Sequence, residues 1–295
     1  MGKEIYGYIS NEYVDTITQF HTILKADSFT KEEYSRCYEI AKQIYLQYKD
    51  RSEPKNYHNR TPEKVYSDAI NDLQLFGDVK ITRNANLILN TIKKVIIDEE
   101  NPTLFTLFSS IKENTGCYYK EANVIHIPKA VADYSSPFLC HELCHGIKDH
   151  YSEENKTVKT LEEVVPILVE LITAYEMGDI YIFKNVCSNR LNFLISNASR
   201  FINSYNMLIS GKLDENEKIL YRFALDEDAC YLNSFYYVMG LFNLYLKDNI
   251  IILNYVSKVL NGEINTKDMI KELECIVTSY DNGYKLGLDK FKKNV

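Results

Sequence analysis

The sequence lacks the features that would place it among secreted or membrane proteins. No stretch approaches 18 consecutive apolar residues, so no membrane span is expected. The first residues, MGKEIYGYIS, contain no apolar core of a signal peptide. Tyr6 also stands where a myristoylation signal would have Ser or Thr. We therefore expect a cytoplasmic protein, with export by a leaderless route left open.

A block of basic residues is also missing. The chain has 34 Lys and Arg against 41 Asp and Glu, which gives a net charge of -7. This mildly acidic balance argues against nucleic acid as a partner. None of the seven cysteines forms a CxxC pair, and their odd number favours reduced, mostly buried thiols over a disulfide framework.

Most of the chain shows the apolar spacing of helices. Helices are predicted at 34–48, from Pro62 through Phe76, and at 86–97, 104–111, 160–177, 180–208, 217–246, 249–260 and 266–280. Between 117 and 128 the sequence CYYKEANVIHIP has two alternating runs around an Ala-Asn pair, which predicts a short hairpin. The fold class expected is mainly α with a small antiparallel β element. Three regions are predicted, 1–115, 116–180 and 181–295, which could also form one continuous unit.

Residues 141–145, His-Glu-Leu-Cys-His, form a pattern that indicates metal binding and proton transfer. Two histidines four residues apart project from one face of a helix, where they can hold one metal ion. Glu142, next to the first histidine, is then placed to accept a proton from an activated water. This pattern is the HExxH signature of zinc metallopeptidases. The alternative is a helix that carries two ordinary histidines.

The helix that carries this pentad has start and stop signals of its own. Ser136 and Pro137 supply an N-cap and a first-turn proline. Gly146 follows the second histidine and 148–155 is polar, so the helix is expected to end soon after Gly146. Cys140 and Cys144 lie one turn apart, and apolar filling of a helix interface is favoured for them over a thiolate ligand or a redox switch.

A catalytic zinc usually has three protein ligands, so a third must be found. His150 does not fit the metzincin pattern, because Lys148 and Tyr151 stand where glycine and histidine are needed. Glu170 is favoured, since it lies in VVPILVELITAY, where a carboxylate is costly to bury without a positive partner. The alternative for Glu170 is a buried glutamate bonded to a tyrosine or lysine.

Other glutamates near Glu170 are ranked lower as ligands. Thr160-Leu-Glu-Glu163 has the pattern of a capping box, which gives the Glu163 side chain a role at the start of the helix. Glu162 and Glu176 lie near the ends of the same helix, where solvation is easy.

This layout resembles that of the gluzincin metallopeptidases. The pentad is followed by a glutamate on the next helix, and 166–173 (PILVELIT) is similar to the third-ligand helix of the oligopeptidase F and thimet oligopeptidase group. The segment 234–240 (SFYYVMG) is similar to the stretch whose tyrosine stabilises the oxyanion in those enzymes. The chain departs from that group in its shorter length, in Cys144 where glycine is usual, and in having no histidine after His150. More distantly, it resembles the ImmA/IrrE-like metallopeptidases.

The resemblance implies a zincin-like catalytic core and a zinc-dependent metallopeptidase that hydrolyses a peptide or protein substrate. The residues implied are the metal ligands His141, His145 and Glu170, the general base Glu142, and Tyr236 or Tyr237 as oxyanion donor. From the residues alone, a Tyr-Tyr pair on a helix is more often core packing. Two alternatives stay open, a regulatory protease specific for one protein partner and a non-enzymatic helical protein that binds metal.

Overall fold

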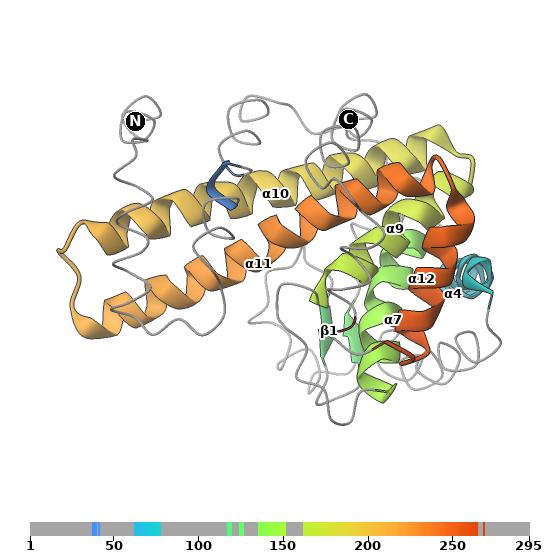
Figure 1. The fold of residues 1–295 in the computed structure, drawn as a ribbon, viewed down its shortest axis with the longest axis horizontal. Helices are drawn as coiled ribbons and strands as arrows, with labels where there is room; N and C mark the ends of the chain where they lie inside the picture. Colours follow the sequence, from blue (N-terminus) through green and yellow to red (C-terminus); the bar gives the residue numbers. More distant parts are fainter. Residues whose placement is uncertain are drawn as a thin grey trace. The chain divides into compact units, whose positions relative to one another are not determined.

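The computed structural model describes residues 37–39, 41, 62–77, 117–119, 124–126, 135–151, 162–264 and 268. This part of the chain is mainly helical, as predicted (Figure 1). None of the helices within these ranges is long and apolar enough to cross a membrane. Its elements are, in order, α4 (Pro62–Leu73), the 3-10 helix η2 (Gln74–Phe76), β1 (Cys117–Tyr119), β2 (Val124–His126), α7 (Ser135–Tyr151), α9 (Val164–Glu176), α10 (Ile180–Ile209), α11 (Glu215–Tyr245) and α12 (Asn249–Leu260).

Several predicted helices fall outside these residues. They are 86–97, 104–111, most of 34–48 and nearly all of 266–280. By contrast, α10, α11 and α12 begin and end within two residues of the predicted ranges.

Contacts along the chain define two compact units. The first comprises 1–52, 158–160 and 190–236, and the second comprises 53–157, 161–189 and 237–295. The division falls within α10 and α11, so each of these helices contributes residues to both units. The three consecutive regions expected from the sequence stay a prediction.

The second unit is built around α7. This helix packs most extensively against α9 and α4, and it also contacts β1 and α12. From α4 and η2, Ala69, Leu73 and Phe76 are all buried, as their predicted spacing on one face requires. Every residue of α9 from Val164 to Ala174 is buried, which fits its nearly unbroken apolar run.

The boundaries of α7 differ from those predicted. Ser136 is not the N-cap, because it lies inside the helix and its hydroxyl donates to Oδ2 of Asp72 on α4 at 2.5 Å. The helix also continues past Gly146 to Tyr151. A glycine inside a helix costs about 1 kcal/mol relative to alanine, and burial of α7 against α4 and α9 outweighs that cost.

The end of α9 matches the prediction. Gly178 has a left-handed φ of 67°, and its N–H donates to the carbonyl oxygen of Tyr175 at 3.2 Å. Glycine reaches this conformation without the steric cost that a side chain would add, and for that reason it is common just after a helix.

Two short strands also lie in the second unit. β1 and β2 pair as a two-stranded antiparallel sheet, and β1 contacts α7. The residues that face each other across the pair are Cys117 and His126, Tyr118 and Ile125, and Tyr119 and Val124.

In the first unit, an ion pair joins the exposed Arg200 of α10 to the buried Asp228 of α11. Nη2 of Arg200 lies 2.5 Å from Oδ1 of Asp228, whose side chain is 1% exposed. Burial raises the pKa of Asp228 to about 6, although Arg200 acts in the opposite direction. Sγ of Cys37 donates to the carbonyl oxygen of Ala229 at 3.3 Å, so Cys37 contacts α11.

Candidate metal centre

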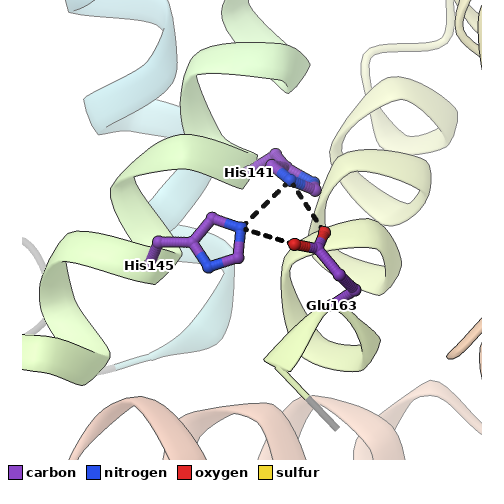
Figure 2. A group of neighbouring side chains, drawn as sticks. All are labelled: His141, His145 and Glu163. Carbon is purple, nitrogen blue, oxygen red and sulfur yellow. Dashed lines mark hydrogen bonds and ion pairs between the residues drawn. The ribbon is translucent and has the colours of Figure 1, made fainter. Parts of the chain in front are cut away.

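Two helices bring three potential metal ligands together, as Figure 2 shows. His141 and His145 project from one face of α7, and their Nε2 atoms are 3.3 Å apart. Glu163, immediately before α9, places Oε2 3.4 Å from Nε2 of His141 and Oε1 3.4 Å from Nε2 of His145. Within the described ranges, these three residues form the one group of His, Cys, Asp or Glu side chains that could hold a metal ion.

The environment keeps Glu163 in its charged form. Its side chain is 14% exposed, and that of His145 is 20% exposed. Burial alone would raise the pKa of the Glu163 carboxyl. The charge of His145 and the hydrogen bonds and charge from the two histidines outweigh burial, so the pKa is held well below its usual value. Glu163 is therefore a carboxylate at neutral pH, which is the form that binds a metal.

The spacing of the three side chains fits a zinc ion. Zinc binds imidazole nitrogen at about 2.0–2.1 Å and carboxylate oxygen at about 2.0–2.2 Å in a tetrahedral arrangement, so neighbouring ligand atoms lie about 3.3–3.5 Å apart. Here the two Nε2 atoms are 3.3 Å apart and each lies 3.4 Å from a different oxygen of the Glu163 carboxylate, and one ligand atom from each residue lies within 4.8 Å of the others. Two imidazoles and one carboxylate are also a ligand set of catalytic zinc sites that keep one position open.

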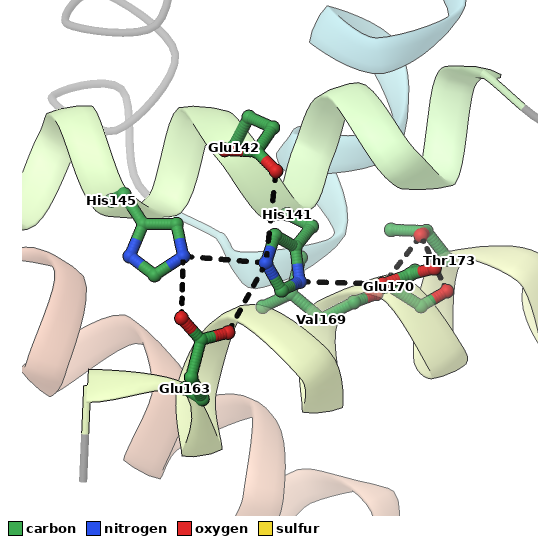
Figure 3. Close-up of polar contacts among 7 residues, drawn as sticks. All are labelled: His141, Glu142, His145, Glu163, Val169, Glu170 and Thr173. Atoms are coloured by element: carbon green, nitrogen blue, oxygen red, sulfur yellow. Dashed lines mark hydrogen bonds and ion pairs between the residues drawn. The ribbon is translucent and has the colours of Figure 1, made fainter. Parts of the chain in front are cut away.

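Glu142 lies beside this group. Its Oε1 is 3.9 Å from Nε2 of His141, and the residue is 4% exposed. Figure 3 shows its carboxylate directed toward the His141 ring. A second carboxylate is thus available next to the potential ligands, as the HExxH pattern requires of a general base.

Glu170 contacts Nδ1 of His141, whereas a third metal ligand would lie next to Nε2 of that ring. Its Oε2 lies 3.3 Å from Nδ1 of His141, and its side chain is completely buried (Figure 3). Nε2 of His141 is the nitrogen that faces His145 and Glu163. Glu170 therefore lies behind the His141 ring, and the carboxylate that meets both Nε2 atoms is that of Glu163.

The capping box predicted with Thr160 lies outside the described residues. Glu163 is itself the N-cap residue of α9, and its side chain makes no capping hydrogen bond there; both of its oxygens face the histidines. The direction of the helices explains the placement. His141 contacts Glu163 and Glu170 whereas His145 contacts Glu163, so α9 runs antiparallel to α7 and its first turn meets His145. The sequence signal that could have identified Glu163 is its position at the start of a returning helix.

The remaining predicted site residues lie on α11 and α7. Tyr236 is buried and belongs to the first unit, whereas Tyr237 is half-buried and belongs to the second. The role of either tyrosine as an oxyanion donor stays a prediction. His150 lies inside α7, which ends at Tyr151, and not beyond the helix as expected.

The two cysteines of α7 are buried thiols that are not joined in a disulfide. Sγ of Cys140 donates to the carbonyl oxygen of Ala69 at 3.4 Å. Burial raises the pKa of Cys140 well above its usual value, and the charges of Asp72, Cys144 and Glu170 add to the shift. A metal ligand must be a thiolate, so these observations favour the packing role.

No protein-family model, curated protein or solved structure matches the chain. Any functional assignment therefore depends on the geometry of His141, His145 and Glu163, and on Glu142 beside them.

Proposed function

We propose that the protein is a zinc-dependent metallopeptidase. His141, His145 and Glu163 would hold the ion, and Glu142 would act as general base. The observation that carries the proposal is that the two Nε2 atoms lie 3.3 Å apart and each lies 3.4 Å from one oxygen of the Glu163 carboxylate, with the Glu142 carboxylate 3.9 Å from Nε2 of His141. A site that held metal for structural purposes alone would not need Glu142.

Each residue of the proposed site would have a separate role in hydrolysis. A bound zinc ion would supply positive charge that polarises a peptide carbonyl and acidifies water. Glu142 would take the proton of the attacking water and pass it to the leaving amine. His141 and His145 as neutral ligands, with Glu163 as the single anionic one, would leave a net charge of about +1 at the site. That charge favours the oxyanion that develops on the carbonyl oxygen.

The burial of Glu142 favours a second candidate, a metal site without peptidase activity. Glu142 and His141 are each 4% exposed, whereas a catalytic zinc keeps one coordination position open to water or substrate. The two candidates agree on the metal ligands and differ in the role of Glu142.

The test combines zinc content with cleavage of a peptide library. We expect the wild-type chain to bind about one zinc ion and to cleave peptides, with activity lost on chelation and restored by zinc. Glu142→Gln should keep the metal and lower cleavage by at least about 100-fold. Glu162→Gln, which changes an exposed carboxylate near the same site, is the matched control and should cleave as the wild type does.

Each result separates the candidates. Zinc binding without cleavage by the wild-type chain would support the non-enzymatic site. Unchanged cleavage by Glu142→Gln would contradict the mechanism, and absence of zinc binding would contradict both candidates.

A further inference from the structure

The carboxylate of Glu170, on α9, lies on the side of the His141 ring that faces away from His145 and Glu163. Oε2 of Glu170 lies 3.3 Å from Nδ1 of His141, whereas Nε2 of the same ring faces His145 and Glu163. An imidazole that binds a metal through Nε2 carries its ring proton on Nδ1. Glu170 therefore contacts the nitrogen of His141 that a metal would leave free.

The Glu170 side chain lies in the buried interior of the second unit, where the thiols of Cys140 and Cys187 interact with its charge. Its side chain is 0% exposed, within the buried stretch of α9 from Val164 to Ala174. The hydroxyl of Thr173 is directed to the backbone oxygens of Val169 and Glu170, at 2.9 and 3.1 Å (Figure 3). A buried carboxylate is costly unless positive charge or hydrogen bonds offset the loss of water.

We propose that Glu170 is a positioning residue for metal binding: it fixes the ring orientation and the tautomer of His141 by accepting a hydrogen bond from Nδ1. The inference rests on the proposed metal site of His141, His145 and Glu163. With the proton held on Nδ1, Nε2 is left as the metal-binding nitrogen. The nearby negative charge also makes the imidazole a stronger ligand.

The conservative change Glu170→Gln separates this role from simple packing. Glutamine has nearly the same shape, but its neutral amide holds a proton on Nδ1 of His141 less strongly than a carboxylate does. The variant therefore removes the charge while it leaves the volume of the buried side chain in place. A packing role predicts that any loss of metal affinity follows from a loss of stability, whereas the positioning role predicts weaker metal binding by a metal-free protein that is as stable as the wild type.

The experiment is an equilibrium zinc titration of the full chain, with the thermal midpoint of the metal-free protein measured in parallel. For Glu170→Gln we expect the zinc dissociation constant to rise about 10- to 100-fold and the metal-free midpoint not to fall. Glu227→Gln changes an exposed carboxylate of α11 and should match the wild type in both measurements. In the zinc-loaded protein, ¹⁵N NMR should show the proton of His141 on Nδ1, and Glu170→Gln should shift that signal.

Other outcomes would overturn the inference. Equal zinc affinity in Glu170→Gln and the wild type would do so, as would a drop in the metal-free midpoint that accounts for the weaker binding. If Glu170→Gln does not fold, the ¹⁵N spectrum of the zinc-loaded wild type decides, because a proton on Nε2 of His141 would exclude the proposed arrangement. A wild-type chain that binds no zinc would contradict the proposed function itself, which is a result distinct from these.

Discussion

Glu163 and His145 are in contact across two helices, with Oε1 of the first 3.4 Å from Nε2 of the second. The other oxygen of the same carboxylate lies 3.4 Å from Nε2 of His141. One side chain at the start of α9 thus meets both histidines of α7. Because α7 and α9 share the most extensive contact among the described elements of the second unit, a metal ion held here would cross-link the centre of that unit.

Zinc is therefore expected to stabilise the folded chain. At a zinc concentration 100 times the dissociation constant, the gain is about 2.7 kcal/mol, and a chelator should reverse it. His145→Ala should lose most of the zinc-dependent rise in thermal midpoint, whereas His150→Ala should keep it. Differential scanning calorimetry with and without zinc measures both variants. A wild-type midpoint that does not respond to zinc would contradict this prediction.

The ligands of the loaded site are expected to be nitrogen and oxygen. Zinc-edge X-ray absorption should show neighbours at about 2.0–2.2 Å and no sulfur at about 2.3 Å, because Cys140 and Cys144 are buried thiols. Cys144→Ala should keep the zinc and lower the free energy of unfolding by about 1 kcal/mol. A sulfur neighbour in the spectrum, or loss of zinc from Cys144→Ala, would show that a thiolate belongs to the site.

The first unit should show pH-dependent stability through Asp228. Burial raises its pKa to about 6, against the opposing effect of Arg200, from about 3.9 in the unfolded chain. Because the folded state binds this proton more tightly, the stabilisation is complete below about pH 4 and is lost as the pH rises through about 6. Between pH 4 and pH 7, the free energy of unfolding should fall by about 1–3 kcal/mol more for the wild type than for Asp228→Asn.

Urea unfolding at several pH values tests the role of Asp228. Glu227→Gln removes an exposed charge that also raises the pKa of Asp228, so its profile should lie between those of the wild type and Asp228→Asn. If Asp228→Asn and the wild type gave parallel profiles, Asp228 would not titrate in this range.

The limits of α10, α11 and α12 were predictable from the sequence because local apolar spacing determines them. The pairing of His141 with His145 was predictable for the same reason, since residues four apart share a helix face. The choice between Glu163 and Glu170 was not, because it depends on where α9 crosses α7. The argument that a buried Glu170 needs a partner agrees with its contact to His141. The sequence argument could not predict that Glu170 would contact Nδ1 of His141 and not Nε2.

The length of α7 depends on packing in the same way. Local signals at Ser136 and Gly146 predicted a shorter helix, but the contacts of α7 with α4 and α9 extend it to Tyr151. Start and stop signals are worth about 1 kcal/mol each, so a well-buried helix can override them.

The central claim is that Glu163, with the two histidines, holds the metal. The most direct measurement is the zinc dissociation constant of the wild type, Glu163→Gln and the control Glu162→Gln. The structure predicts that Glu163→Gln weakens binding by more than about 100-fold, beyond the range typical of a residue that only supports a ligand, and that Glu162→Gln binds as the wild type does. Wild-type affinity in Glu163→Gln, with the large loss in Glu170→Gln instead, would contradict it.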